Sequence, residues 1–279
     1  MTQPNPLQRY FRQPAIYLRL PSNGKYYPDG VLDMPPNGEI PIYPMTAMDE
    51  ITYRTADALF NGSAIVNVIQ SCVPNIRDPW QMPTVDLDTL LIGIRIASYG
   101  HELELESKCP NCEEENAFGV DLRRIMETMT APDYDTSVVA GDIEIYFHPQ
   151  SFKQQNENAI MQFEDQKLIQ AVPDADLPEK EKLELINGAL IKLAQMSVDS
   201  MSSSISTIRA GGDIVTDQDH IQEFLRNCDK NIYNLVRNKL INIREQGTIK
   251  PLTIKCTSCE KSYETPFTLD VSNFFGQDS

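Results

Sequence analysis

The chain has 279 residues and a formal net charge of −16, with 40 acidic against 24 basic residues, and 41% of its residues are hydrophobic. This acidic excess argues against nucleic acid as the main partner, because lysine and arginine contacts to phosphate supply most of the non-specific affinity. The hydrophobic content is sufficient for a folded core. No apolar run approaches the roughly 20 residues that a membrane-spanning helix needs, so we expect no membrane segment.

The first 45 residues are rich in proline and tyrosine and poor in helix signals. Residues 15–20 alternate enough for one strand, and the stretches LPSNGKYYP and PPNG predict turns. The first 26 residues are basic, and no acidic residue precedes Asp29. We therefore expect an extended N-terminal arm over residues 1–45 that either wraps its own domain or reaches a neighbouring acidic subunit.

Residues 46–100 form a predicted helical region. A capping-box-like start at Thr46 opens a helix to about Phe60, a second helix covers 63–72, and a third covers 86–99 with Gly100 as its terminating residue. The loop at 73–83 contains three prolines and the only tryptophan, Trp80. An aromatic anchor beside Arg77 and Asp78 is typical of an interface hot spot, although a rigid turn whose tryptophan fills the core has the same composition.

Residues 123–248 are predicted to be mainly helical. A short helix is expected at 121–130 and a strand at 142–148. Helices then follow at 151–172, from 178 to 196 or beyond, at 216–228 and at 229–247, whereas residues 202–212 are ambiguous. Phe274 and Phe275 are candidates to anchor the C-terminal tail.

Two CxxC motifs, 147 positions apart, carry the clearest chemical signal: Cys109 with Cys112, and Cys256 with Cys259. Each follows an alternating strand and precedes a glutamate, a polar turn and an aromatic-x-aliphatic-Asp run (residues 118–121 and 267–270). Two thiolates of one CxxC turn can reach the same ion, and zinc favours four such ligands. The matching flanks predict two halves of one structural four-cysteine zinc site.

Two other interpretations of the CxxC pairs compete with zinc. Redox dithiols are one, but neither pair follows the strand-then-helix pattern of a thioredoxin-type motif. Structural disulfides are the other, but they need an oxidising compartment, and the N-terminus shows no signal-peptide pattern. The remaining cysteines, Cys72 and Cys228, lie in apolar helical patterns and are expected to be small buried hydrophobic residues.

The expected fold class is α+β: a mainly helical body with a four-cysteine, zinc-ribbon-like β module that is split by a helical insertion. We expect an extended arm at 1–45, a helical region at 46–100, a split ribbon at 101–122 plus 249–272, and an insertion at 123–248. A structural zinc ion stabilises a module whose own core is small, and in isolated modules it contributes about 10 kcal/mol or more.

The sequence offers no candidate active site. Its three histidines, His101, His148 and His220, are separated along the chain, and each is expected to be structural or exposed. No nucleotide-binding, metalloprotease or nucleophile-elbow motif occurs. Alternating acidic residues at 102–106 fit a solvated sheet face. We therefore predict a protein that is not an enzyme.

Several blocks resemble the baseplate hub protein family of T-even-type contractile-tailed bacteriophages. They are MTAMDE (45–50), DALFNG (57–62), SCVPNIRDP (71–79) and VDLDTLLIGIRIASYG (85–100), together with the two cysteine motifs, YFRQP (10–14) and LPSNGK (20–25). The resemblance covers residues 10–122 and 249–270, whereas the insertion is similar only in its general helical character.

This resemblance implies a virion structural or assembly role at the central hub of the tail baseplate, with hub, spike or tail-tube proteins as partners and no enzymatic chemistry. A homo-oligomeric ring in the virion is expected, after assembly in the host cytoplasm. Two alternatives stay open. One is a baseplate assembly chaperone that is absent from the finished particle. The other is a zinc-ribbon regulator that binds nucleic acid.

Overall fold

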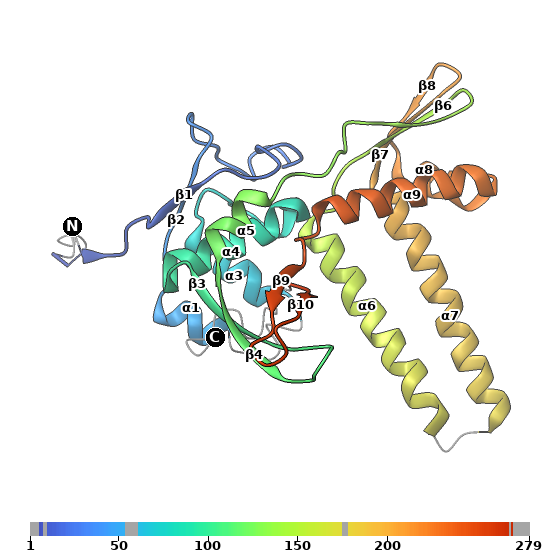
Figure 1. Cartoon of the computed structure of the whole chain (residues 1–279). Coiled ribbons are helices and arrows are strands. Elements are labelled where there is room, and N and C mark those ends of the chain that lie inside the picture. Colours follow the sequence, from blue (N-terminus) through green and yellow to red (C-terminus); the bar gives the residue numbers. More distant parts are fainter. Residues whose placement is uncertain (1–5, 8–9, 54–60, 175–177, 268, 270–279) are drawn as a thin grey trace. The chain divides into compact units, whose positions relative to one another are not determined.

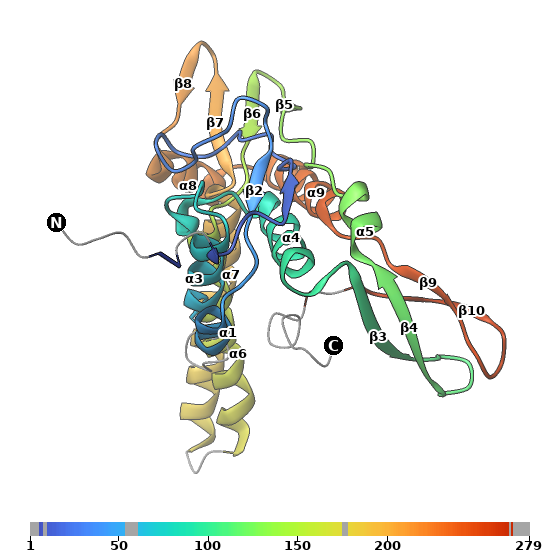
Figure 2. The ribbon, with the colours of Figure 1, turned by 90° about the vertical axis from the view of Figure 1, so that its left-hand side faces the viewer.

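The structure is a computed structural model that describes residues 6–7, 10–53, 61–174, 178–267 and 269. The chain divides into two compact units, which are described separately here. Unit 1 comprises Met1–Thr130 and Thr248–Ser279, and unit 2 comprises Ala131–Gly247. Helices and antiparallel strands are both abundant (Figures 1 and 2). Four cysteines also lie close together. The expected α+β class is therefore confirmed.

Unit 1 combines a helical layer with three two-stranded antiparallel sheets. Its elements are β1 (Ile16–Leu18), β2 (Ile40–Ile42), α1 (Ala47–Tyr53), α3 (Ser63–Cys72), η2 (Pro79–Gln81), η3 (Thr84–Asp86), α4 (Leu87–Tyr99), β3 (Glu102–Lys108), β4 (Glu115–Asp121), α5 (Leu122–Thr128), β9 (Leu252–Lys255) and β10 (Ser262–Thr265). β1 packs so closely on α4 that a Cβ on Gly93 would lie 2.5 Å from Leu18 Cδ2. A side chain at this position of α4 would require the Leu18 side chain to shift.

The N-terminal segment is fastened to unit 1 by Arg12. Its guanidinium donates hydrogen bonds to the carbonyl oxygens of Pro44 (2.6 Å) and Ser71 (2.8 Å), and it lies 3.3 Å from an Asp49 carboxylate oxygen. The strands that follow bury Leu18 and Ile40. From Arg12 onward, the described part of the expected arm thus packs on its own unit.

The proline-rich loop at 73–83 is held against residues 31–33. Arg77 N donates to Val31 O at 2.8 Å, and an isolated bridge pairs Leu32 with Ile76. Asp78 caps the short η2 helix by accepting a hydrogen bond from Trp80 N, and the Trp80 side chain is half-buried. Backbone hydrogen bonds therefore hold the loop in place, and its tryptophan is neither fully buried nor fully exposed.

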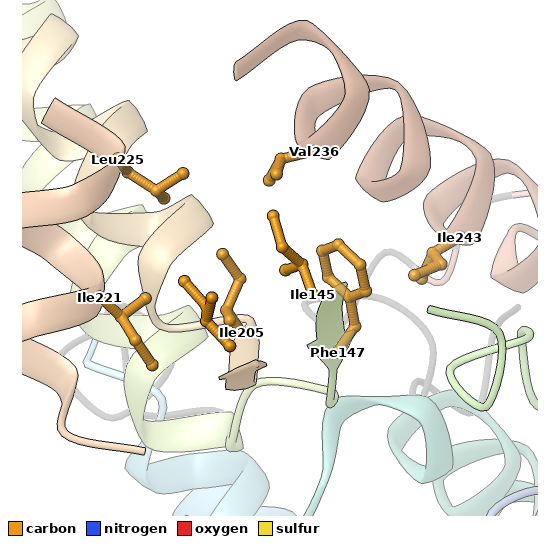
Figure 3. Packing of buried hydrophobic residues seen from close by; sticks show 8 residues of the cluster. Ile145, Phe147, Ile205, Ile221, Leu225, Val236 and Ile243 are labelled. Atoms are coloured by element: carbon orange, nitrogen blue, oxygen red, sulfur yellow. The ribbon is translucent and has the colours of Figure 1, made fainter. Parts of the chain in front are cut away.

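Unit 2 has a four-stranded antiparallel sheet in the order β5-β6-β7-β8. Its elements are β5 (Val138–Ala140), β6 (Ile143–Phe147), α6 (Phe152–Ala171), η4 (Val172–Asp174), α7 (Glu179–Ser202), β7 (Ile205–Ala210), β8 (Asp213–Val215), α8 (Gln218–Asn227) and α9 (Lys230–Gly247). One face of the sheet packs on α8 and α9. Figure 3 shows this core, which buries Ile145, Phe147, Ile205, Ile208, Ile221, Leu225, Val236 and Ile243.

Helices α6 and α7 lie side by side as an antiparallel hairpin within unit 2 (Figures 1 and 2). A capping box starts α6, in which Ser151 and Gln154 satisfy each other's backbone amides. An ion pair of 3.0 Å between Lys192 Nζ and the buried Asp165 joins the two helices.

The two ends of unit 2 meet. A Cβ on Gly247 would lie 3.0 Å from Pro132 Cγ, and Asp133 N donates to Gln246 Oε1 at 2.9 Å. The chain therefore enters and leaves unit 2 at neighbouring points.

Most of the expected helices are confirmed, including those at 63–72 and 86–99, where Gly100 follows α4 at a φ of 92°. The first helix runs over Ala47–Tyr53, and its expected continuation over residues 54–60 lies outside the described residues. The insertion holds more sheet than expected, since β5, β7 and β8 were not predicted. Phe274 and Phe275 also lie outside the described residues. No described helix combines the length and the hydropathy that crossing a bilayer requires.

Candidate metal centre

Two hairpins of unit 1 carry the cysteine motifs in matching positions. β3 pairs with β4 and ends with Lys108 opposite Glu115, and β9 pairs with β10 and begins its turn after Lys255 opposite Ser262. Figures 1 and 2 both show the two hairpins side by side. In each hairpin the CxxC motif forms the turn, so segments distant in sequence supply two cysteines each.

The two turns have the same backbone geometry. Cys109 N donates to Glu114 O at 2.9 Å while Glu113 N donates to Cys109 O at 2.8 Å. In the second turn, Cys256 N donates to Lys261 O at 3.0 Å and Glu260 N donates to Cys256 O at 3.1 Å.

The residue after each second cysteine adopts a left-handed conformation, with φ of 61° at Glu113 and 57° at Glu260. Each also pairs with the lysine that ends the preceding strand, at 3.6 Å for both Lys108–Glu113 and Lys255–Glu260. The repeat in the sequence is thus a six-residue KCxxCE unit.

The turns bring all four predicted thiols into one cluster. The Sγ atoms of Cys109, Cys112, Cys256 and Cys259 lie within 4.8 Å of one another. Two separations across the hairpins are 3.8 Å (Cys109–Cys259) and 3.6 Å (Cys112–Cys256). In a tetrahedron with Zn–S bonds of roughly 2.3 Å, the sulfur atoms are separated by about 3.8 Å. The donor set and its spacing therefore fit a tetrahedral metal ion.

The backbone around the cluster favours thiolates at two of the four positions. Hydrogen bonds from the amides of Cys259 and Ser258 lower the pKa of Cys256 to about 6. Burial raises the pKa of Cys109, but the amides of Asn111 and Cys112 outweigh it and the net shift is downward. Cys112 is exposed, and its three neighbouring sulfurs, together with desolvation, outweigh the amide of Glu114 and raise its pKa to about 12. Sulfur atoms this close compete for protons, which a cation at their centre would displace.

Polar contacts join the two hairpins around the cluster. The buried Asn116 accepts hydrogen bonds from Thr257 N (2.8 Å) and Thr257 Oγ1 (2.9 Å), and its amide nitrogen lies 3.6 Å from Cys256 Sγ. On the adjoining strands, the Ser107 and Tyr263 hydroxyls are 2.6 Å apart. Sequence reasoning missed these residues. Asn116 carried a signal, since it occupies the same strand face as Phe118, where an apolar residue is the norm.

The other residues considered from sequence lie elsewhere. Cys72 is fully buried at the end of α3, where burial raises the pKa of its thiol to about 12, and Cys228 is half-buried against the unit 2 core. His148 follows β6, and burial lowers its pKa, whereas His220 is exposed on α8. The described residues give the histidines no shared cluster with the cysteines.

Comparison with known families finds one family model that matches most of the chain. Residues 16–276 match the family described as T4 bacteriophage base plate protein. The chain belongs to this family. The T4 base plate family supports a structural role in the phage baseplate, a place in the virion tail and a non-enzymatic function. Neither the curated proteins nor the solved structures contain a match.

Proposed function

We propose that this chain is a structural subunit of the baseplate hub of a contractile phage tail, where it binds neighbouring hub, spike or tail-tube proteins. The family match over residues 16–276 carries this proposal. The resemblance of residues 45–100 to hub proteins is the reason for proposing the hub as its position within the baseplate. Assembly takes place in the host cytoplasm, and the assembled subunit remains in the virion tail.

We further propose that Cys109, Cys112, Cys256 and Cys259 bind one structural zinc ion. Their sulfur separations of 3.6–3.8 Å across the hairpins match the edges of a tetrahedral thiolate site. Four thiolates leave no position for water or substrate, so such an ion would fasten the two hairpins together and would not act on a ligand.

The surface of unit 1 offers contacts suited to a polyvalent assembly. Tyr10 and Phe11 are 70% and 55% exposed, and Arg77 is exposed beside the half-buried Trp80. Aromatic and arginine side chains dominate the binding energy of many interfaces. Repetition of such contacts in a homo-oligomeric ring would make individually modest interfaces strong.

Quantitative mass spectrometry of purified virions, normalised to the tail-tube protein, tests the role. A hub subunit gives a fixed stoichiometric signal. Absence from particles together with abundance in the lysate would replace the proposal with an assembly chaperone. Salt-sensitive retention on a polynucleotide column would instead favour a nucleic-acid-binding regulator.

Metal analysis of the purified protein tests the zinc site separately. We expect one zinc per chain in the wild-type protein, a large loss in Cys256→Ser, and no loss in the matched variant Cys228→Ser, because Cys228 lies in unit 2 outside the cluster. A folded wild-type protein that contains no metal would refute the site.

A further inference from the structure

Helix α9 is basic within an acidic chain. Its 18 residues contain four basic residues and one acidic residue, whereas the whole chain carries a net charge of −16. Lys230, Arg237 and Arg244 are exposed and follow one another at intervals of seven residues, so they lie along one face of the helix about 10 Å apart. Lys230 and Arg237 form no ion pair with another described residue. We call these three residues the basic line.

An exposed apolar side chain accompanies the basic line. Ile241 follows Arg237 by four residues and precedes Arg244 by three, so the three side chains share one face of α9. Ile241 is 46% exposed. A different face of the helix packs inward, where Val236 and Ile243 are buried in the core of unit 2. The outward face thus combines an aliphatic centre with flanking arginines, a composition that suits a protein interface.

The first cysteine hairpin presents the opposite charge. Glu102, Glu104 and Glu106 are all exposed, and because they alternate along β3 they project from one face of the hairpin about 7 Å apart. We call them the acidic ladder. Leu103 lies on the other face of β3 and is buried. The ladder therefore lies on the solvent-facing side of the hairpin.

Small residues lie across from the acidic ladder on β4. Glu104 pairs with Gly119, and Glu106 pairs with Ala117. Both small residues are exposed, and nothing lies within 4 Å of the position that a Cβ on Gly119 would occupy. Neither glutamate forms an ion pair with another described residue. This face is therefore open to a helix along β4 and negatively charged along β3.

We infer that the basic line of one copy of this chain docks on the acidic ladder of a second copy. Complementary charge across an interface determines which surfaces meet, and here the chain itself supplies the complement of each surface. In this contact Ile241 lies over Ala117 and Gly119, with the arginines beside the glutamates. Long, flexible lysine and arginine side chains accommodate the difference in spacing between the two rows of charges.

The contact joins two different surfaces, so every copy has one of each to offer. Copies therefore add head to tail, and such a heterologous contact forms a closed ring when the rotation between neighbours allows it. The inference deepens the homo-oligomeric ring of the proposed function and rests on that proposal for its place in the virion.

Analytical ultracentrifugation of the full-length chain at micromolar concentrations and low salt tests this contact. Wild-type protein should self-associate. Lys230→Glu/Arg237→Glu and Glu104→Lys/Glu106→Lys should each raise the dissociation constant about 100-fold or more, because like charges would then face each other. An equimolar mixture of the two variants should assemble again, since the altered charges of one complement the unaltered and altered charges of the other.

Two controls separate the contact from a general effect of charge. Lys153→Glu/Lys180→Glu, at exposed positions of α6 and α7, changes the net charge as much as the α9 variant does and should assemble like wild type. Salt of about 1 M, at which the Debye length falls to about 3 Å, should weaken the wild-type association. Unchanged thermal melting by circular dichroism shows that the variants fold, and glutamine at the same positions replaces any variant that does not.

Three results would overturn the inference: a monomeric wild-type protein, a folded variant that assembles like wild type, or a mixture of the two variants that stays monomeric. A monomeric wild type that a polynucleotide column retains through Arg237 would assign the basic line to nucleic acid instead. None of these results touches the proposed hub role, which depends on the virion stoichiometry. Conversely, absence from virions together with assembly restored by mixing would leave the contact intact and remove the hub assignment.

Discussion

The cysteine hairpins of unit 1 and the sheet of unit 2 are stabilised by different kinds of interaction. The hairpins bury Cys109, Ile254, Cys256 and Tyr263 at their junction, so half of their small core consists of predicted metal ligands. Unit 2 buries eight aliphatic or aromatic residues between its sheet and two helices. The contrast predicts that the hairpins depend on metal chemistry, whereas unit 2 depends on the hydrophobic effect.

Metal removal should produce the largest difference in stability between the two regions. A chelator should unfold the paired hairpins, because zinc binding in small modules contributes about 10–16 kcal/mol to folding. Hydrogen exchange should therefore lose protection in β3, β4, β9 and β10 while β6 and β7 remain protected. Equal loss of protection in both regions would show that unit 2 does not fold independently of the metal.

A core truncation in unit 2 should have the opposite effect from metal removal: it should destabilise unit 2 and leave the cysteine hairpins intact. Ile205 is fully buried in its core, and Ile205→Ala should destabilise unit 2 by about 2–5 kcal/mol without changing the zinc content. Denaturant unfolding followed by hydrogen exchange in β6 measures the effect. Ile214→Ala, at a position that is 65% exposed, is the control and should change stability by less than about 0.5 kcal/mol. Zinc loss in Ile205→Ala would contradict this prediction, because it would show that the metal site depends on the core of unit 2.

Asn116 tests whether the hairpins are joined by more than the thiols. Asn116→Ala removes the acceptor of the part-buried hydrogen bond from the Thr257 amide, which should cost about 0.5–1.5 kcal/mol. Since Asn116 also lies against Cys256 Sγ, zinc affinity should fall about 10–100-fold in a chelator competition. Asn111→Ala, at an exposed turn position whose amide nitrogen lies 3.9 Å from Cys109 Sγ, is a matched comparison with a smaller expected effect. Equal affinities in both variants would contradict the special role of Asn116.

The smallest expected change is stabilising. Glu113 has a left-handed backbone that glycine adopts without strain, so Glu113→Gly should stabilise the first hairpin by about 0.5–1 kcal/mol in thermal unfolding. The lost ion pair with Lys108 is exposed and contributes little. Glu114→Gly is the control, because its φ is not positive and glycine there should destabilise. A stability ranking in the reverse order would contradict the turn geometry.

Sequence patterns predicted the long helices because their signals are local. Gly62 precedes α3 and Gly100 follows α4, both with positive φ, and apolar residues recur at helical spacing within the two helices. β7 was ambiguous for a reason visible only in the sheet. Phe147 pairs with Ile205 while Tyr146 pairs with Thr207, so the register shifts, and Ile205 and Ile208 are both buried although they are three residues apart. This shift removes the period of two on which strand prediction relies.

The candidate metal centre shows the same difference between local signals, which the sequence reveals, and tertiary contacts, which it does not. The four cysteines were found from spacing and matching flanks, since both are properties of the linear chain. The contacts of Asn116 with Thr257 and of Ser107 with Tyr263 depend on how two hairpins face each other across more than 140 residues of sequence. β2 escaped prediction because Pro41 occupies its centre, a position that only an edge strand tolerates.

The meeting of Pro132 and Gly247 has a consequence for the order of folding. In an unfolded chain, the cysteine pairs are tethered by a long loop whose closure reduces entropy. Once unit 2 has folded, its adjoining ends replace that loop with a short tether from residue 112 to 132 and from 247 to 256. The effective concentration of one thiol pair around the other then rises, and metal capture becomes nearly a local event. Folding of unit 2 would in this way bring the two cysteine pairs near each other, although they are far apart in the sequence.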